Sequence, residues 1–185
     1  MITGPGLVVC MGMVGGRTGL LVVLAEAEPA VAQLRLQLDP VARLGVPAHV
    51  TVLFPFMPAS EIRDDVMVRL TALFRAVPAF TQSLVRTAWF GDEVLWLASD
   101  ASDVLRSLTQ LVWTAFPAYP PYEGQFDDVV PHLTIADHGP FDEMQAAERT
   151  VQPHLPIVAM TRAVTLMVEQ QSGRWEAAAS FALNG

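Results

Sequence analysis

The apolar positions of this chain alternate between two periods, the two-residue repeat of β-strands and the 3.6-residue repeat of α-helices. Short apolar or β-branched runs predict strands at residues 20–25, 49–54, 84–90, 94–98, 132–136, 163–169 and 174–183. Apolar side chains three and four residues apart predict amphipathic helices at residues 28–38, 61–74, 102–116 and 141–151. In the first helix, Val31, Leu34 and Leu38 define the face that we expect to be buried. Turn residues at 91–93 and 170–173 predict two hairpins.

The two halves of the chain, about residues 18–90 and 93–184, repeat the same order of elements. In each half a strand and a helix precede a second strand, which begins with a histidine shortly after a proline. These stretches read Val46-Pro47-Ala48-His49-Val50-Thr51-Val52 and Val130-Pro131-His132-Leu133-Thr134-Ile135. Two copies are too few to stack as a solenoid, so the pattern predicts one duplicated unit.

Both histidine strands carry a His-x-Thr motif. Side chains alternate between the two faces of a strand, so His49 shares a face with Thr51, and His132 shares one with Thr134. The residues between and after them are apolar and face the other side, where they can pack under helices. Each strand therefore presents an imidazole and a hydroxyl about 6.5–7 Å apart along the backbone. Two histidines simply buried in a sheet, with threonines favoured by β-propensity, are the structural alternative.

The composition excludes several classes of protein. The chain of 185 residues is 52% hydrophobic and 16% charged, which is too apolar for a disordered chain. Its 19 acidic and 11 basic residues give a net charge of −8, which opposes binding to duplex DNA. All basic residues are arginine, so Schiff-base lysine chemistry and a P-loop lysine are excluded. The single cysteine, Cys10, permits neither an internal disulfide nor a multi-cysteine zinc site.

No stretch of the sequence is typical of a membrane span or a secretory signal. The longest apolar runs, residues 7–14 and 20–25, are far shorter than the roughly 20 residues of a spanning helix. Residues 1–5 contain no Lys or Arg, and no clear small-residue cleavage site follows. We expect a cytoplasmic protein without membrane contact, in which residues 1–16 form an extension ahead of a single domain at 17–185.

His49-Val50-Thr51-Val52 and His132-Leu133-Thr134-Ile135 resemble the two motifs of the 2H phosphoesterase superfamily, which includes 2′-5′ RNA ligase-like proteins and cyclic phosphodiesterases. The separation of 83 residues is in keeping with that family, and the resemblance covers about residues 18–184. It implies an α+β fold of two pseudo-symmetric antiparallel-sheet lobes, intertwined and covered by outer helices. It also implies that the motif strands face each other across a central cleft.

The residue types in the motifs suit hydrolysis of a phosphodiester. Histidine titrates near neutral pH, so His49 and His132 can act as general base and general acid, in an order that the sequence leaves open. We expect them on adjacent strands, with the hydroxyls of Thr51 and Thr134 donating to transition-state oxygens. We predict a monomeric phosphodiesterase, independent of metals and cofactors, that hydrolyses 2′,3′-cyclic phosphates or 2′-5′ linkages of nucleotides or short RNA. The alternative is a non-catalytic domain that binds a phosphorylated ligand or nucleotide in the same cleft.

Other residues are weaker candidates for contact with the substrate. Three are predicted to bind it, although core packing, loop anchoring and simple exposure explain them as well: Phe56, Tyr122 and His138. Three arginines are candidates for a phosphate contact that the sequence does not place: Arg17, Arg86 and Arg162.

Asp137 follows the second motif at a place where RNA ligase-like members often carry an arginine. Strand alternation predicts that it faces away from His132 and Thr134, on the side of Leu133 and Ile135. The missing positive charge argues against ligase activity on long RNA.

Overall fold

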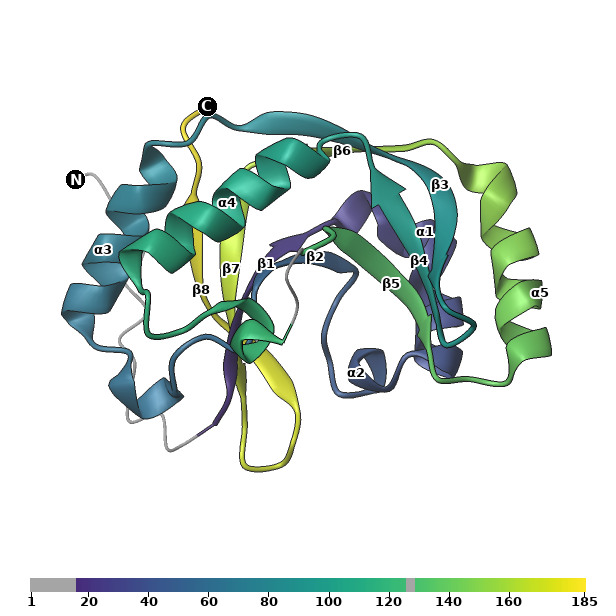
Figure 1. The fold of residues 1–185 in the computed structure, drawn as a ribbon, viewed down its shortest axis with the longest axis horizontal. Helices are drawn as coiled ribbons and strands as arrows, with labels where there is room; N and C mark the ends of the chain where they lie inside the picture. The colour runs from purple at the N-terminus through teal and green to yellow at the C-terminus, as the bar shows by residue number, and fades with distance from the viewer. Residues whose placement is uncertain (1–15, 126–128) are drawn as a thin grey trace, which may run out of the picture.

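The computed structural model describes residues 16–125 and 129–185, whose strands form two four-stranded antiparallel sheets (Figure 1). Sheet 1 has the order β2-β1-β7-β8, with β1 at Thr18–Val23, β2 at His49–Leu53, β7 at Ala163–Glu169 and β8 at Trp175–Ala182. Sheet 2 has the order β5-β4-β3-β6, with β3 at Phe80–Phe90, β4 at Val94–Ser99, β5 at His132–Asp137 and β6 at Ile157–Thr161. The predicted α+β class and both predicted hairpins are confirmed.

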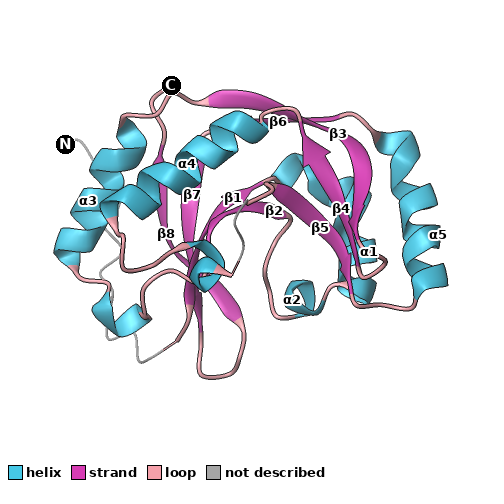
Figure 2. Ribbon diagram, in the orientation of Figure 1, coloured by secondary structure: helices cyan, strands magenta, loops and turns pink. Residues whose placement is uncertain are grey.

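Helices cover the two sheets from outside (Figure 2). The α-helices are α1 (Glu28–Leu38), α2 (Pro40–Arg43), α3 (Asp64–Arg75), α4 (Ser102–Ala115) and α5 (Phe141–Val151). Short 3-10 turns are η1 (Ala25–Ala27), η2 (Ala59–Glu61), η3 (Pro121–Gly124) and η4 (Gln152–His154). In sheet 1, α4 packs on β2 and α3 packs on β8, whereas α1 and α5 both pack on β5 of sheet 2.

The helix that follows the first strand of each half crosses to the other sheet. α1 leaves β1 of sheet 1 and packs on β5 of sheet 2, whereas α4 leaves β4 of sheet 2 and packs on β2 of sheet 1. Strands cross as well, because β3 belongs to sheet 2 and β7 belongs to sheet 1. Neither sheet is therefore built from one half of the chain alone.

Local sequence explains why the elements begin and end where they do. Pro29 stands in the first turn of α1, where its missing N–H costs nothing, and the helix ends at Leu38 because the backbone of Asp39 is extended. α1 and α5 occupy the predicted residues. On the motif strands the apolar residues predicted to pack under helices, such as Val50 and Ile135, are fully buried.

The structure differs from the predicted elements at one edge of sheet 2. β3 begins at Phe80 rather than at residue 84, because its first residues pair with β6, a strand that was not predicted. β6 has only five residues, of which the β-branched Ile157, Val158 and Thr161 favour a strand, and its pairing with β3 fixes its place at the edge of sheet 2. The expected N-terminal extension lies outside the described residues apart from Gly16. Among the described helices, none is both long and apolar enough to span a membrane.

Candidate active site

The two motif strands lie against each other where the sheets meet. β2 is an edge strand of sheet 1 and β5 is an edge strand of sheet 2, and residues of the two strands are in contact. His49 is the first residue of β2 and His132 is the first residue of β5, so each motif occupies the same position in its strand. The prediction that both histidines lie on adjacent strands is confirmed.

Both histidines make the same hydrogen bond to the backbone. Nδ1 of His49 lies 2.8 Å from the carbonyl oxygen of Pro47, and Nδ1 of His132 lies 2.6 Å from the carbonyl oxygen of Val130. A carbonyl oxygen only accepts hydrogen bonds, so Nδ1 carries the proton in both rings. In the neutral ring Nε2 then holds the lone pair, and it is the nitrogen that can take up a proton.

The surroundings of both imidazoles favour the neutral ring. The pKa of His49 is lowered to about 4, first by burial and then by the positive charge of Arg35, with a smaller effect of His132. The pKa of His132 is also below its ordinary value, because burial outweighs the hydrogen bond to Val130. The two histidines therefore differ in their electrostatics, since a cationic neighbour acts on His49 but is not the cause of the shift at His132.

A tyrosine from the loop before β5 reaches the first motif. The hydroxyl of Thr51 hydrogen-bonds the phenol of Tyr122, and burial raises the pKa of that phenol. The backbone N–H of Tyr122 donates to the carbonyl oxygen of Phe54 at 2.7 Å, just beyond β2. Tyr122 has φ 50°, a left-handed conformation that a bulky residue keeps only when its surroundings hold it there. The structure thus places the predicted substrate-binding residue Tyr122 beside the motif residue Thr51.

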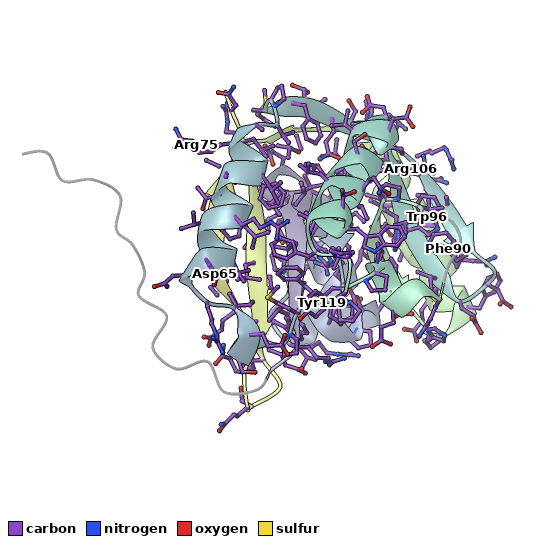
Figure 3. All side chains as sticks on the ribbon, turned by 60° about the vertical axis from the view of Figure 1, so that its left-hand side comes forward. Asp65, Arg75, Phe90, Trp96, Arg106 and Tyr119 are labelled. Carbon is purple, nitrogen blue, oxygen red and sulfur yellow. The ribbon has the colours of Figure 1, made fainter. Side chains whose placement is uncertain are left out.

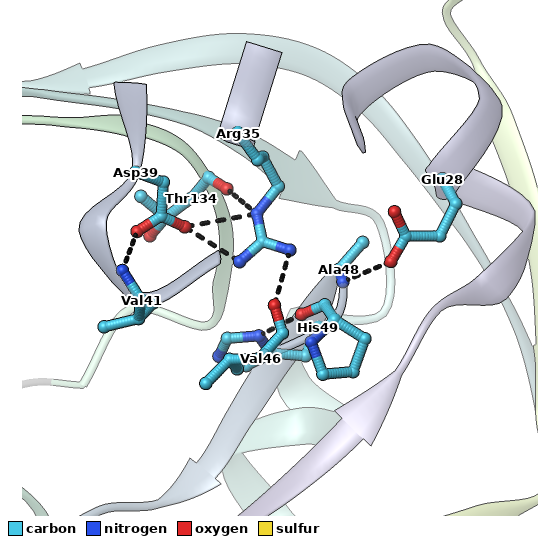
Figure 4. Close-up of polar contacts among 9 residues, drawn as sticks. Glu28, Arg35, Asp39, Val41, Val46, Ala48, His49 and Thr134 are labelled. Atoms are coloured by element: carbon cyan, nitrogen blue, oxygen red, sulfur yellow. Dashed lines mark hydrogen bonds and ion pairs between the residues drawn. The ribbon is translucent and has the colours of Figure 1, made fainter. Parts of the chain in front are cut away.

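A buried arginine of α1 connects the two motif strands (Figure 4). Arg35 is 2% exposed. Its Nε donates to the carbonyl oxygen of Thr134 at 3.0 Å, and its Nη1 donates to the carbonyl oxygen of Val46 at 3.3 Å. Its charge is balanced by Asp39, whose Oδ2 lies 2.8 Å from Nη2. One guanidinium therefore holds the segment before His49 and the strand of the second motif at a fixed separation.

The first turn of α1 adds a contact to the same segment. A carboxylate oxygen of Glu28 accepts a hydrogen bond from the backbone N–H of Ala48 at 2.7 Å, immediately before His49 (Figure 4). The role of Arg35 was not predicted, because an arginine in an amphipathic helix ordinarily faces solvent. Its only signal is its position, four residues before Asp39 and three before the end of the helix.

Two aromatic side chains of sheet 2, both visible in Figure 3, surround His132. The ring of Phe90 stacks on Trp96 with centroids 4.8 Å apart and meets the His132 ring edge-on at 5.0 Å. The Trp96 ring lies 5.7 Å from that of His132. Phe90 is 37% exposed, whereas Trp96 is buried and its Nε1 has no hydrogen-bond partner within residues 16–125 and 129–185. Neither residue could be predicted from the sequence, because only the pairing of β4 with β3 and β5 brings them to the histidine.

A β-bulge overturns the predicted direction of Asp137. Trp96 pairs with Thr134 and the preceding residue of β4 pairs with Ala136, so Ile135 is an extra residue in β5. Beyond the bulge Asp137 pairs with Val94, which lies on the same face of β4 as Trp96. The prediction that Asp137 faces away from Thr134 was therefore wrong, because the extra residue of the bulge turns the side chain of Asp137 to the same face as that of Thr134.

His138 follows Asp137 at the surface. Its side chain is exposed, its Nδ1 hydrogen-bonds a carboxylate oxygen of Asp137, and its Nε2 lies 3.6 Å from a carboxylate oxygen of Glu93. The hydrogen bond to Asp137 is the main reason why the pKa of His138 is raised above its ordinary value. The contacts described for His138 thus join it to two acidic residues and to none of the motif side chains.

Phe56 lies in the core and not among the motif side chains. It is 4% exposed and packs edge-on against Phe116 and Tyr119, with centroids 5.3 and 5.8 Å away. Its remaining surface borders a cavity of about 490 Å³ that is also lined by Arg17 and Glu123. None of the four motif residues lines this cavity, so the predicted role of Phe56 as a wall of the substrate site has no support in its position.

Two antiparallel sheets whose edge strands bring two His-x-Thr motifs together define a protein of the 2H phosphoesterase class. The chain matches the family model of the 2′-5′ RNA ligase superfamily over residues 23–173, a range that includes both motifs. It belongs to that superfamily. No curated protein matches the chain.

Several solved structures share the fold. LigT of E. coli in complex with 3′-AMP has a TM-score of 0.62 at 15% sequence identity, covering 92% of this chain and 99% of LigT. TT0787 of Thermus thermophilus has a TM-score of 0.55 at 19% identity, covering 91% of this chain and 98% of that protein. A protein described as a phosphoesterase has a TM-score of 0.54 at 17% identity, covering 92% of this chain and 99% of its own. At these identities the likeness establishes the fold.

Proposed function

We propose that this protein is a phosphodiesterase that hydrolyses 2′,3′-cyclic phosphates or 2′-5′ linkages of nucleotides or short RNA. The observation that carries the proposal is the matched pair of Nδ1–H···O=C hydrogen bonds on two adjacent strands. These bonds fix both rings in the tautomer whose Nε2 can exchange a proton. Hydrolysis of a phosphodiester needs one group that accepts a proton and one that donates a proton, and the two Nε2 atoms can fill these roles.

His49 is the better general base of the two. The positive charge of Arg35 favours its neutral ring, so its Nε2 can take a proton from water while the water oxygen bonds to phosphorus. His132 then acts as the general acid and gives its Nε2 proton to the ribose oxygen as the bond between that oxygen and phosphorus breaks. The negative charge of the bound phosphate raises the pKa of His132 and supplies the protonated ring that this step requires.

Three hydroxyl groups can stabilise the negative charge that develops on the phosphoryl oxygens. Thr51 and Thr134 lie on the same strands and faces as the histidines, and Tyr122 contacts Thr51. Hydrogen-bond donors that are already held in place stabilise a transition state without the cost of reorganising water. The two histidines supply both proton transfers, so we expect activity to persist in EDTA.

The substrate is expected to be small. LigT, which shares the fold, has been crystallised with 3′-AMP, ATP and NADP⁺, which supports a ligand of nucleotide size. Asp137 lies on the same face as Thr134 and adds to the net charge of −8, so it repels a long polyanion. We therefore propose hydrolysis of short substrates rather than ligation of long RNA.

The test is turnover of adenosine 2′,3′-cyclic phosphate and of 2′-5′-linked ApA by purified variants. His49→Ala and His132→Ala are each expected to reduce kcat by about 10²–10⁴ on the substrate that the wild type cleaves. The double variant is expected to lose less than the product of the single losses, because both groups act in one event. His154→Ala, a substitution of an exposed histidine outside both motifs, is the matched control. Full activity of both single-histidine variants would contradict the proposal.

A non-catalytic nucleotide-binding domain is the second candidate function. The feature that favours it is that burial lowers the pKa of both imidazoles, because binding alone needs no protonated histidine. This candidate predicts that 3′-AMP binds to the wild type while no cyclic or 2′-5′ substrate is turned over.

A further inference from the structure

The face of sheet 2 that carries His132 and Thr134, here called the motif face, continues from β5 across β4 onto β3. Strand pairing aligns His132 with Ala98 of β4, and Ala98 with Arg86 of β3. Paired residues of neighbouring strands point to the same side of a sheet. Arg86 is therefore in one row with His132, and only the methyl group of Ala98 stands between them.

The contacts of β3 with α5 confirm this direction. Thr87 donates a hydrogen bond from its Oγ1 to Glu148 of α5 at 2.6 Å. Trp89 packs against the ring of the first residue of α5 at 5.6 Å. Thr87 and Trp89 thus face α5, so Arg86 and Phe90, which alternate with them along the strand, face the opposite side.

Arg86 offers a positive charge that no acidic residue of the described part of the chain neutralises. It is exposed, and within residues 16–125 and 129–185 it makes no hydrogen bond or ion pair. Two other arginines already form ion pairs within the protein: Arg17 pairs with Glu169 at 2.8 Å, and Arg35 pairs with Asp39 at 2.8 Å. In a chain with a net charge of −8, an uncompensated guanidinium on the motif face is a specific attraction for an anionic group.

Phe90 offers an aromatic surface on the same strand. Its ring contacts His132 edge-on at 5.0 Å and is still 37% exposed. Beneath it Trp96 keeps an indole N–H that lacks a partner among the described residues, although leaving a buried donor unpaired is unfavourable. A nucleotide base of any identity can stack on such a ring, because every base has a π-face.

We propose that Arg86 and Phe90 form a subsite for the nucleotide next to the scissile phosphate, Arg86 binding the neighbouring phosphate and Phe90 stacking on a base. The proposal rests on the proposed function and names its substrate class, namely short oligonucleotides of two or more residues rather than mononucleotides. The distance supports it, because two strand spacings place the backbone of Arg86 about 10 Å from that of His132. At that distance Arg86 lies too far from β2 to contact the scissile phosphate together with the motif residues. The distance is suitable for contact with the neighbouring phosphate of the substrate.

The first experiment compares kcat/KM for adenosine 2′,3′-cyclic phosphate with that for ApA ending in a 2′,3′-cyclic phosphate. We expect the wild type to prefer the dinucleotide, and Arg86→Gln and Phe90→Leu each to reduce the ratio of the two values about tenfold. Arg75→Gln, at an exposed arginine at the end of α3, is the matched control for Arg86. Phe141→Leu is the matched control for Phe90, since Phe141 packs on the opposite face of the sheet. Both controls are expected to keep the ratio of the wild type.

An unchanged ratio in both variants would overturn the subsite, and so would an equal loss on both substrates. A second measurement separates this failure from that of the proposed function. Binding of 5′-phosphorylated ApA to the His49→Ala/His132→Ala protein needs no turnover and can be followed by calorimetry at several salt concentrations. Arg86→Gln is expected to weaken this binding and to reduce the slope of log Kd against log salt by about 0.7, the value for one phosphate of a single strand. Unaltered affinity and slope would overturn the proposal even if the enzyme is active.

Discussion

Replacing Arg35 with methionine tests how the two motif strands are held together. The substitution removes the donor from three buried acceptors, which are the carboxylate of Asp39 and the carbonyl oxygens of Thr134 and Val46. Removing one partner of a buried ion pair ordinarily costs about 3–5 kcal/mol, because the other charge stays buried without compensation. We expect R35M to lose this much free energy of unfolding in a urea titration. Adding Asp39→Leu removes the stranded carboxylate and is expected to restore about half of that loss or more.

The double variant R35M/D39L also separates the electrostatic role of Arg35 from its structural role. The positive charge of Arg35 lowers the pKa of His49, so its removal raises that pKa from about 4 toward the ordinary value of 6.5. A base with a higher pKa is lost to protonation at a higher pH. The acid limb of the kcat/KM profile is therefore expected to move to higher pH in R35M/D39L. Arg35→Lys keeps the charge but cannot form the same fork of hydrogen bonds, so it should keep the acid limb and still lose stability.

Two results would refute this reasoning about Arg35. An acid limb of R35M/D39L that coincides with that of the wild type would show that Arg35 does not set the protonation of His49. A free energy of unfolding of R35M equal to that of the wild type would show that the guanidinium does not hold the motif strands.

Three further predictions concern pH, the core and the loop before β5. Because the pKa of His49 is about 4 in the folded chain and has its ordinary value of 6.5 in the unfolded chain, the unfolded state binds more protons between these values. Stability should therefore fall by up to about 3 kcal/mol as the pH drops through this window, and His49→Phe should lose that part of the pH dependence in urea titrations at pH 7 and 4.5. Val50→Ala and Ile135→Ala remove fully buried side chains and should each cost about 1–4 kcal/mol of unfolding free energy, whereas shifts below about 0.5 kcal/mol would contradict their placement in the core. Tyr122→Phe removes the hydroxyl that contacts Thr51 and should reduce kcat about tenfold, while Tyr119→Phe, whose hydroxyl contacts a glutamate outside the motifs, should not.

The motif strands could be predicted from the sequence because the pattern that defines each of them lies within a few consecutive residues. The alternation of polar and apolar residues in 49–54 and 132–136 predicts which side chains pack inward, and Val50 and Ile135 are buried as expected. Sequence analysis also identified the proline and histidine at the same place in both halves, and the contact of β2 with β5 brings these residues together.

Features that depend on a partner strand or a partner helix escaped prediction. The bulge at Ile135 exists because β4 pairs two of its neighbouring residues with Thr134 and Ala136, and nothing in the sequence of β5 marks an extra residue. The periodicity of α1 placed Val31, Leu34 and Leu38 on its buried face. Val31 and Leu38 are buried and Leu34 packs partly buried against the core, but the buried Arg35 was not predicted. Arg35 is inside because α1 crosses to the other sheet, where its guanidinium donates to the carbonyl oxygen of Thr134 while also donating to that of Val46 before β2.

The exchange of α1 and α4 between the sheets resembles a domain-swapped pair joined into one chain. Each half contributes one His-x-Thr strand, and a helix from the other half packs on that strand, α4 on β2 and α1 on β5. A fragment ending at the turn between β3 and β4 would keep His49 and lose the strand on which α1 rests. The histidine pair can therefore assemble only where both halves of the chain are present, and we expect a fragment of either half to lack it.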